Sequence, residues 1–403
     1  MMSLNMKVEH MLGYHSFEIP TAIKHGIGAV KHIGEEVQNL GADKVLLVTG
    51  PGLYKAGAVN PVIVNLEEAG VDVVIFNDIE PNPPVRLIEK GANVYQQEGC
   101  NGLVAVGGGS PMDTAKGIGV EVTHEGSVLD YEAAEGKKEL EHRIPPLITV
   151  PTTAGTGSEV TQWAVITDED REIKFNTGGP LIAAHLAIID PELHVSMPPH
   201  VTAMTGIDVI SHAVECYTMK LAQPVTDAVA LLAMEYAAKY IRRAYADGTD
   251  LEARYGMAQG AMLAGLAYGS ESAGAAHAMS QTLGGFIPVA HGQCVAAMMG
   301  PVMEYNWKGT PERFARIAQA FGIDTAPMSN EEAARAAVNW MYDLVEDLDI
   351  PTLEEQGVDP ELIERLAKAA MEDPQTEGNP RDLSIPDYEW IYKRCFNQVP
   401  KTV

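Results

Sequence analysis

Four side chains in the second half of the sequence are of types that bind metal ions. Asp208 and His212 stand four residues apart in TGIDVISHAVE, so they share one face of the helix expected there. His277 follows in AGAAHAMSQ and His291 in PVAHGQC. One carboxylate and three imidazoles suit a divalent first-row metal, iron(II) or zinc, with an open position for a substrate.

Taken singly, each of these histidines is more often structural than a ligand, so their surroundings matter. His277 lies in an apolar, small-residue segment, and His291 follows a proline turn. Polar groups on such segments need partners, and a metal is one. Glu215, seven residues after Asp208, either supports a ligand from behind or is an ordinary helix charge. The remaining histidines show no comparable spacing, and we expect most of them at the surface.

A glycine-rich turn in the first half could bind phosphate. Gly108 and Gly109 follow an apolar run and allow close approach of a ligand to the backbone. We expect Ser110 to cap the next helix, with Asp113 completing an S-x-x-D box, and such a helix start binds anions. The alternative is a tight turn without a ligand, because Met112 occupies the third glycine position of the usual dinucleotide fingerprint.

A second loop, PTTAGTGSE at 151–159, also follows an apolar run. Its hydroxyls and free amides suit the ribose and amide of a nucleotide, although a solvated turn would have the same composition. Two such loops at the carboxyl ends of strands favour a dinucleotide site.

The elements that position these loops alternate between strand and helix. Apolar strands are predicted at 45–50, 71–76 and 146–151 and in NGLVAVGGGS at 101–110, which runs into a glycine turn, with helical spacing between them. This pattern indicates an α/β domain built on a parallel sheet with helices on both faces. After Asp190 long helical patterns take over, for example at 310–322 and from 331. We therefore predict a nucleotide-binding domain at 1–195 and an all-α domain at 196–403.

Composition excludes several classes of partner. The 403 residues carry 28 basic and 55 acidic side chains, a net charge of −27, which argues against nucleic acid and anionic membrane. The four cysteines are far apart, which is typical of a reducing compartment. No targeting segment is evident, and the apolar stretch from Met257 is too short to span a bilayer. We expect a cytoplasmic protein in which that stretch is a buried helix.

These motifs together resemble the iron-containing (group III) alcohol dehydrogenase family. The resemblance covers nearly the whole chain. It is carried by GGGSPMDTAK, PTTAGTGSEVT, DPEL, TGIDVISHAVE, HAMSQTLGG with His291, and NPR at 379–381. It implies a nucleotide-binding α/β domain, a helical domain and an active site between them.

The resemblance also implies roles for individual residues. The metal ligands it implies are Asp208, His212, His277 and His291. The pyrophosphate loop would be Gly108, Gly109 and Ser110, and the nicotinamide contacts Thr152, Thr153, Thr156 and Lys174. Asp113 is expected among the cofactor-binding residues as well. The implied activity is hydride transfer between NAD or NADP and a small alcohol or aldehyde, with the metal polarising the substrate oxygen.

The sequence departs from the family at several positions. Gln281 stands where many relatives have a further histidine, and glutamine cannot shuttle a proton. Gly50 stands where NAD-preferring relatives have an aspartate that repels the 2′-phosphate, which leaves NADP open. Ala275 and Ala276 stand where relatives often have larger residues, and Trp163 and Glu271 are also unusual for the family. The substrate pocket should therefore differ from that of well-known relatives.

Three alternative functions stay open at this point. One is a transhydrogenase-like enzyme with tightly held nicotinamide, and another is a non-catalytic homologue that binds nucleotide or metal. A glycerol dehydrogenase or dehydroquinate synthase type is disfavoured by His212. We also expect a homodimer or larger homo-oligomer, with the segment 17–26 near its interface.

Overall fold

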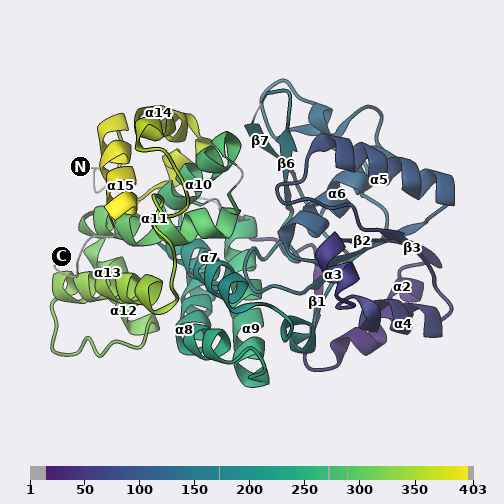
Figure 1. Cartoon of the computed structure of the whole chain (residues 1–403), viewed down its shortest axis with the longest axis horizontal. Helices are drawn as coiled ribbons and strands as arrows, with labels where there is room; N and C mark the ends of the chain where they lie inside the picture. Colours follow the sequence, from purple (N-terminus) through teal and green to yellow (C-terminus); the bar gives the residue numbers. More distant parts are fainter. Residues whose placement is uncertain (1–14, 172, 271–272, 288, 398–403) are drawn as a thin grey trace.

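A computed structural model describes residues 15–171, 173–270, 273–287 and 289–397, and it consists of an α/β half and a helical half (Figure 1). The strands of the main sheet are β1 (Ala22–His25), β2 (Lys44–Thr49), β3 (Asp72–Phe76), β4 (Gly102–Gly107), β5 (Leu147–Pro151) and β8 (Leu186–Ile189). Their order is β1-β8-β5-β4-β2-β3, and every neighbouring pair is parallel. The predicted parallel sheet is confirmed.

Helices cover both faces of this sheet, as predicted. They are α2 (Ile33–Asn39), α3 (Pro51–Lys55), α4 (Asn60–Glu68), α5 (Val85–Glu98) and α6 (Gly109–Thr123). Side chains alternate along each strand. In β2, Leu46 and Val48 pack into the core beneath α5 and α6, whereas Val45 and Leu47 pack into the core beneath α2 and α4 (Figure 1). Burial on both faces explains why the central strands are largely apolar on both faces.

Three features of this half did not emerge from the sequence pattern. The edge strand β1 is short, polar and mostly exposed, and β8 is only four residues long. An antiparallel hairpin, β6 (Trp163–Asp168) with β7 (Ile173–Gly178), stands apart from the main sheet. Its alternating burial comes from packing one face on α6 and leaving the other partly open.

The second half is helical, as predicted. Its helices are α7 (Pro199–Thr218), α8 (Pro224–Ala246), α9 (Leu251–Ser270), α10 (Ala275–Phe286), α11 (His291–Asn306), α12 (Pro311–Ala320), α13 (Asn330–Asp347), α14 (Ile363–Glu372) and α15 (Ile385–Asn397). The apolar stretch from Met257 lies within α9, which packs on α7 and α8. Across the described ranges, no helix combines the length and the apolar character needed to cross a bilayer.

The loop after β5 brings the two halves into close contact. A Cβ atom at Gly157 would lie 2.4 Å from the Cα of Gly265 in α9, and Gly157 has a φ of +62°. Only glycine satisfies both requirements without strain. Nearby, the fully buried His194 has its Nε2 3.0 Å from the carbonyl oxygen of Pro151. The expectation of a surface position is therefore wrong for His194, because the end of β5 needs a polar partner there.

Candidate metal centre and nucleotide cleft

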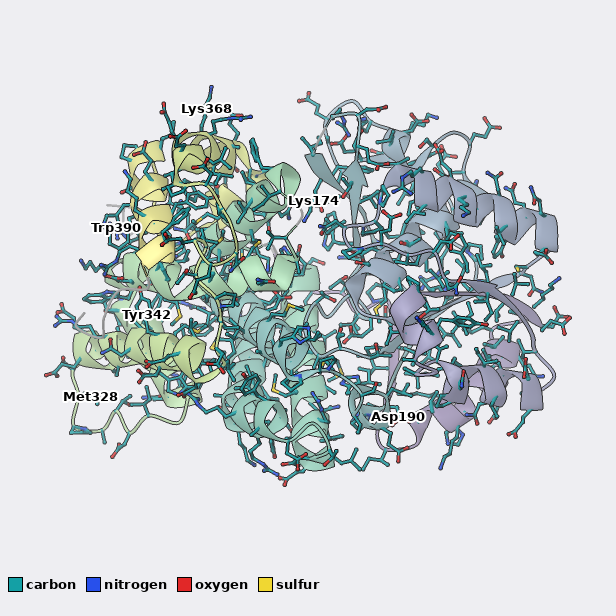
Figure 2. The ribbon with its side chains drawn as sticks, viewed as in Figure 1. Lys174, Asp190, Met328, Tyr342, Lys368 and Trp390 are labelled. Carbon is teal, nitrogen blue, oxygen red and sulfur yellow. The ribbon has the colours of Figure 1, made fainter. Side chains whose placement is uncertain are left out.

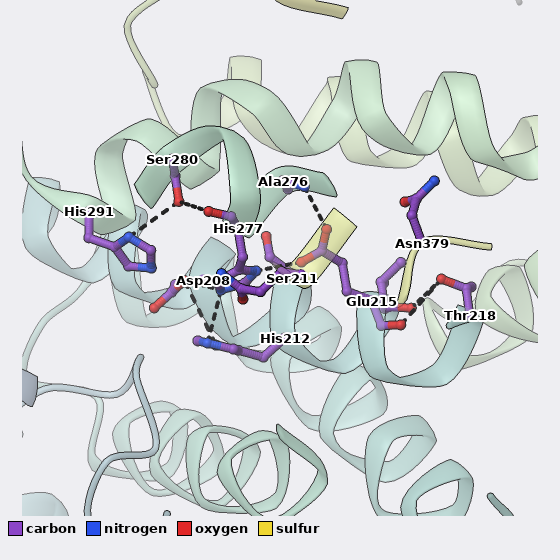
Figure 3. Close-up of polar contacts among 12 residues, drawn as sticks. Asp208, Ser211, His212, Glu215, Thr218, Ala276, His277, Ser280, His291 and Asn379 are labelled. Carbon is purple, nitrogen blue, oxygen red and sulfur yellow. Dashed lines mark hydrogen bonds and ion pairs between the residues drawn. The ribbon is translucent and has the colours of Figure 1, made fainter. Parts of the chain in front are cut away.

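Helix α7 carries three polar side chains on its inner face. Asp208, His212 and Glu215 follow one another at helical spacing, and all three are buried (Figure 3). The rest of this face is largely apolar, so the helix packs tightly on its neighbours and these groups are buried with it. Their burial requires partners from other elements.

Helices α10 and α11 supply those partners. His277 lies in the first turn of α10, and His291 is the first residue of α11, so both point toward α7 (Figure 3). Ser280 Oγ lies 3.3 Å from Nδ1 of His291, which leaves Nε2 of that imidazole for another partner. Among the described residues, the structure groups Asp208, His277 and His291 as a possible metal site. His212 lies beside this group, with its Nε2 3.0 Å from that of His277.

The separations among these groups suit a single ion. One ligand atom each from Asp208, His277 and His291 lies within 4.8 Å of the others. The Nε2 atoms of His277 and His212 are 3.0 Å apart, and Nε2 of His277 lies 3.7 Å from Asp208 Oδ1. Ligand atoms around a tetrahedral ion with bonds of about 2.1 Å are separated by roughly 3.4 Å. Asp208 Oδ1 and His212 Nδ1 are buried without a hydrogen-bond partner among the described residues, so the donor set fits a metal.

Glu215 holds His277 from the side away from Asp208. Its Oε2 contacts Nδ1 of His277, and its Oε1 accepts a hydrogen bond of 2.7 Å from the backbone amide of Ala276. A carboxylate on Nδ1 places the proton there and leaves Nε2 free to bind a metal. Of the two possibilities raised by the sequence, the geometry favours support of a ligand over an ordinary helix charge.

The electrostatics of the four groups follow from burial and mutual contact. Burial lowers the pKa of His212 to about 4 and that of His291 to about 3, so both are neutral near pH 7. Burial opposes ionisation of Asp208, but the surrounding imidazoles hold its pKa below the ordinary value. Burial likewise opposes a charge on His277, but Glu215 and Asp208 raise its pKa to about 10, so a metal would bind Nε2 by replacing the proton there.

A cavity between the two halves contains this group. From the α/β half it is lined by Gly109, Ser110, Asp113, Thr156, Trp163 and Lys174. From the helical half it is lined by His212, Tyr268, His277, Gln281 and His291. Five of the eight residues expected to contact the cofactor therefore face the same space as the metal-binding side chains.

The other three expected cofactor residues, Gly108, Thr152 and Thr153, lie beside this lining. A Cβ at Gly108 would be 3.0 Å from Thr153 Oγ1, so the two loops touch and glycine is needed for their approach. Thr152 is buried, and its hydroxyl has no hydrogen-bond partner among the described residues. The loops are thus placed together at the carboxyl ends of β4 and β5, where parallel sheets bind ligands.

The predicted capping box is wrong. Helix α6 begins at Gly109 with Gly108 as its N-cap and no side-chain cap, so Ser110 lies inside the first turn. Asp113 instead accepts hydrogen bonds from Ser158 Oγ at 2.6 Å and from the amide of Val165 at 3.1 Å. These bonds tie α6 to the second loop and to β6, and they leave the first-turn amides of α6 for an anion.

Lys116 is a buried residue that the sequence gave no reason to single out. Its ammonium donates to the carbonyl oxygens of Ser158 and Trp163 and to Thr161 Oγ1, and it lies 3.8 Å from Asp113. Burial lowers its pKa to about 8, with Asp113 opposing the shift. A lysine among the small and apolar residues at 115–120 was the available signal.

Lys174 reaches from β7 toward the helical half (Figure 2). A Cβ at Gly284 of α10 would lie 2.7 Å from its Nζ, and burial lowers its pKa. Gln281 lines the cavity where relatives are expected to have histidine. Tyr268 was missed by sequence reasoning, and Glu271 lies outside the described residues. Ala275 and Ala276 are buried in the first turn of α10.

Comparison with protein families decides the assignment. A model described as iron-containing alcohol dehydrogenase matches residues 20–191, and one for the C-terminal part of the Fe-containing alcohol dehydrogenase family matches residues 202–396. The chain belongs to the iron-containing alcohol dehydrogenase family. The resemblance drawn from the motifs is confirmed.

Individual relatives agree with this membership. The chain is 78% identical over 402 residues to a choline dehydrogenase of Bacillus subtilis (strain 168), covering 100% of both chains. It is 40% identical over 382 residues to an NAD-dependent methanol dehydrogenase of Bacillus methanolicus, covering 94% of this chain and 100% of the relative. A crystal structure of a 1,3-propanediol oxidoreductase superposes with a TM-score of 0.92 at 38% identity, covering 95% of this chain and 100% of the other.

The predicted reaction class follows from this membership. The protein is a metal-dependent, NAD-linked alcohol dehydrogenase that acts on alcohols or aldehydes, and its family is an iron-containing one. The hypothesis of a non-catalytic homologue is not supported, because the relatives are oxidoreductases.

Proposed function

We propose that this iron-containing alcohol dehydrogenase oxidises choline to its aldehyde with NAD as the hydride acceptor. The observation that carries the proposal is the 78% identity, over the full length of both chains, to a choline dehydrogenase. Support comes from the cavity, which offers the aromatic faces of Trp163 and Tyr268 beside the histidines. Aromatic faces suit a quaternary ammonium group.

We further propose that Asp208, His212, His277 and His291 hold the metal, iron in the first place and zinc as the alternative. When bound, the metal supplies Lewis acidity toward an alcohol or carbonyl oxygen. Glu215 fixes the ring orientation of His277, and Ser280 does the same for His291.

The dinucleotide would lie across the carboxyl ends of β4 and β5, with residues 1–195 as its domain and 196–403 as the catalytic domain. Its pyrophosphate would meet the α6 N-terminus at Gly108–Ser110, where the amides are free. Thr152, Thr153, Thr156, Asp113 and Lys174 would contact or support the nicotinamide half. Gln281 donates and accepts hydrogen bonds but takes up no proton, so the proton released from the alcohol must leave by another group or by water.

Two experiments test this proposal. Iron-loaded enzyme, prepared without oxygen, is assayed for NADH formation with choline, methanol and 1,3-propanediol. We expect kcat/KM to be highest for choline, and preference for either of the other alcohols would overturn the substrate assignment. Metal content is then measured beside a His291→Ala variant. About one iron or zinc per chain, lost in the variant, supports the site, and an unchanged metal content would refute it.

Oligomeric state and location complete the proposal. Strand β1 is an edge strand that pairs only with β8 among the described strands, and it lies in the segment 17–26. An unpaired edge is a surface that a second copy of the chain could cover. We propose a homodimer or larger assembly through this edge, working in the cytoplasm, and a monomeric mass in solution would contradict it.

A further inference from the structure

Two aromatic side chains line the cavity beside the metal-binding group, and we call them the aromatic wall: Trp163 of β6 and Tyr268 of α9. Both are half-buried rather than fully enclosed. The ring centre of Tyr268 lies 4.8 Å from that of His212 and 6.1 Å from that of His277. A short alcohol with its oxygen among the histidines would therefore extend along Tyr268.

The indole of Trp163 is fixed in place. Gly178 pairs with it across the hairpin, and a Cβ at Gly178 would lie 2.0 Å from Cε3 of the indole. Glycine at that position is what lets the ring lie across the strand. The carbonyl oxygen of Trp163 also accepts a 2.7 Å hydrogen bond from Lys116. Trp163 is thus held in place through both its indole ring and its backbone.

Charge is distributed unevenly along the cavity. Trp163 pairs with Gly178 at one end of the hairpin, and Thr167 pairs with Lys174 near the other. Four residues of strand separate the two pairs by about 13 Å at the backbone. Lys174 lines the same cavity, and its ammonium is directed at Gly284 of α10. Lys116 is nearer, but hydroxyl and carbonyl oxygens surround its ammonium and Asp113 lies 3.8 Å away. The carboxylate of Asp113, which accepts a hydrogen bond from the amide of Val165 in the same strand as Trp163, is an acidic group of the cavity lining on this side.

We propose that the aromatic wall recognises the quaternary ammonium group of the substrate and gives the enzyme its preference for cationic alcohols. This inference rests on the proposed oxidation of choline. A trimethylammonium group has no N–H to donate, so hydrogen-bond acceptors recognise it poorly, whereas the negative faces of aromatic rings attract it. Only two carbons separate the ammonium from the hydroxyl of choline, which keeps it beside the histidines, where Tyr268 stands.

The test compares choline with 3,3-dimethylbutan-1-ol, its neutral isostere, in Trp163→Leu and Tyr268→Leu variants. Leucine keeps apolar bulk but has no aromatic face. We expect the ratio of kcat/KM for choline to that for the isostere to fall about 10- to 30-fold in each leucine variant. The Trp163→Phe variant should keep most of the ratio. Trp390→Leu, at an exposed position of α15, is the matched control and should leave it unchanged.

An equal fall in both kcat/KM values, with the ratio preserved, would overturn the inference while leaving choline oxidation intact. If the wild type oxidises only the isostere, the proposed function fails instead. Tetramethylammonium then tests the wall by itself. It should inhibit turnover of the isostere, and about 10-fold more weakly in the leucine variants. Equal inhibition of wild type and variants would refute recognition of the ammonium group by the aromatic wall. If Trp163→Leu does not fold, Tyr268→Leu alone provides the test.

Discussion

Replacing Glu215 by glutamine should weaken metal binding more than its distance from the metal suggests. Its two oxygens accept from two different N–H groups, Nδ1 of His277 and the amide of Ala276. Glutamine has one carbonyl oxygen and one NH2 group, so it can accept from only one of them. Its NH2 group would then face the other N–H donor in a pocket where Glu215 is 3% exposed.

The size of the effect follows from these contacts. Loss of the group that orients a ligating histidine lowers metal affinity about 10- to 100-fold. The buried donors that face each other without an acceptor lower the free energy of unfolding by about 1–3 kcal/mol. Glu215→Gln should therefore fold at moderate temperature, melt earlier than the wild type and lose metal more readily.

The assay is a titration of metal-free protein with zinc against a chelator of known affinity, together with thermal unfolding. Glu252→Gln is the control, because that carboxylate is 62% exposed and pairs with Arg243 and with the hydroxyl of Tyr240 in α8, not with a metal-binding side chain. It should bind metal as the wild type does. Wild-type affinity in Glu215→Gln would refute the reasoning, and so would an equal loss in both variants.

Three further predictions concern cofactor preference, pH and the contact between the halves. Gly50→Asp should lower kcat/KM with NADP at least about 10-fold relative to kcat/KM with NAD. Nothing lies within 4 Å of a Cβ at this position, so the side chain fits, and its carboxylate would repel the 2′-phosphate. An unchanged ratio of the two kcat/KM values would contradict this prediction. Burial holds the pKa of His194 at about 4 against 6.5 for the free side chain, so its contribution to stability is complete above pH 6.5 and is lost as pH falls toward 4. Urea unfolding is measured at pH 7 and at pH 5. Between these two pH values the free energy of unfolding should fall less in His194→Gln than in the wild type, by up to about 2 kcal/mol. An equal fall in both proteins would contradict this prediction. Gly157→Ala should lower the free energy of unfolding by about 1–3 kcal/mol, since its Cβ would meet the backbone of α9. Gly70 also has a positive φ, but nothing lies close to a Cβ there, so Gly70→Ala should lower the free energy of unfolding by less. Equal urea midpoints for the two variants would show that the contact between Gly157 and α9 does not affect stability.

The sequence was sufficient where a single physical pattern decided the outcome. Strands β2, β4 and β5 are largely apolar because helices cover both faces, and that run is visible in the sequence. The hairpin was missed because its identity depends on packing against α6, which no local pattern records. The start of α6 was misplaced for a similar reason. Asp113 is engaged by Ser158 and Val165 from distant parts of the chain, so it does not form the local box.

The sequence by itself determined the donor types, the family and the shared helical face of Asp208 and His212, since those depend on residue identity and on spacing within one helix. Only the tertiary structure decided that α10 and α11 bring His277 and His291 against that face, and that Trp163 and Tyr268 share their cavity. It also decided which of two roles Glu215 has. The physical reason is that such contacts join residues far apart in sequence, and the packing of whole helices, rather than local spacing, sets their distances.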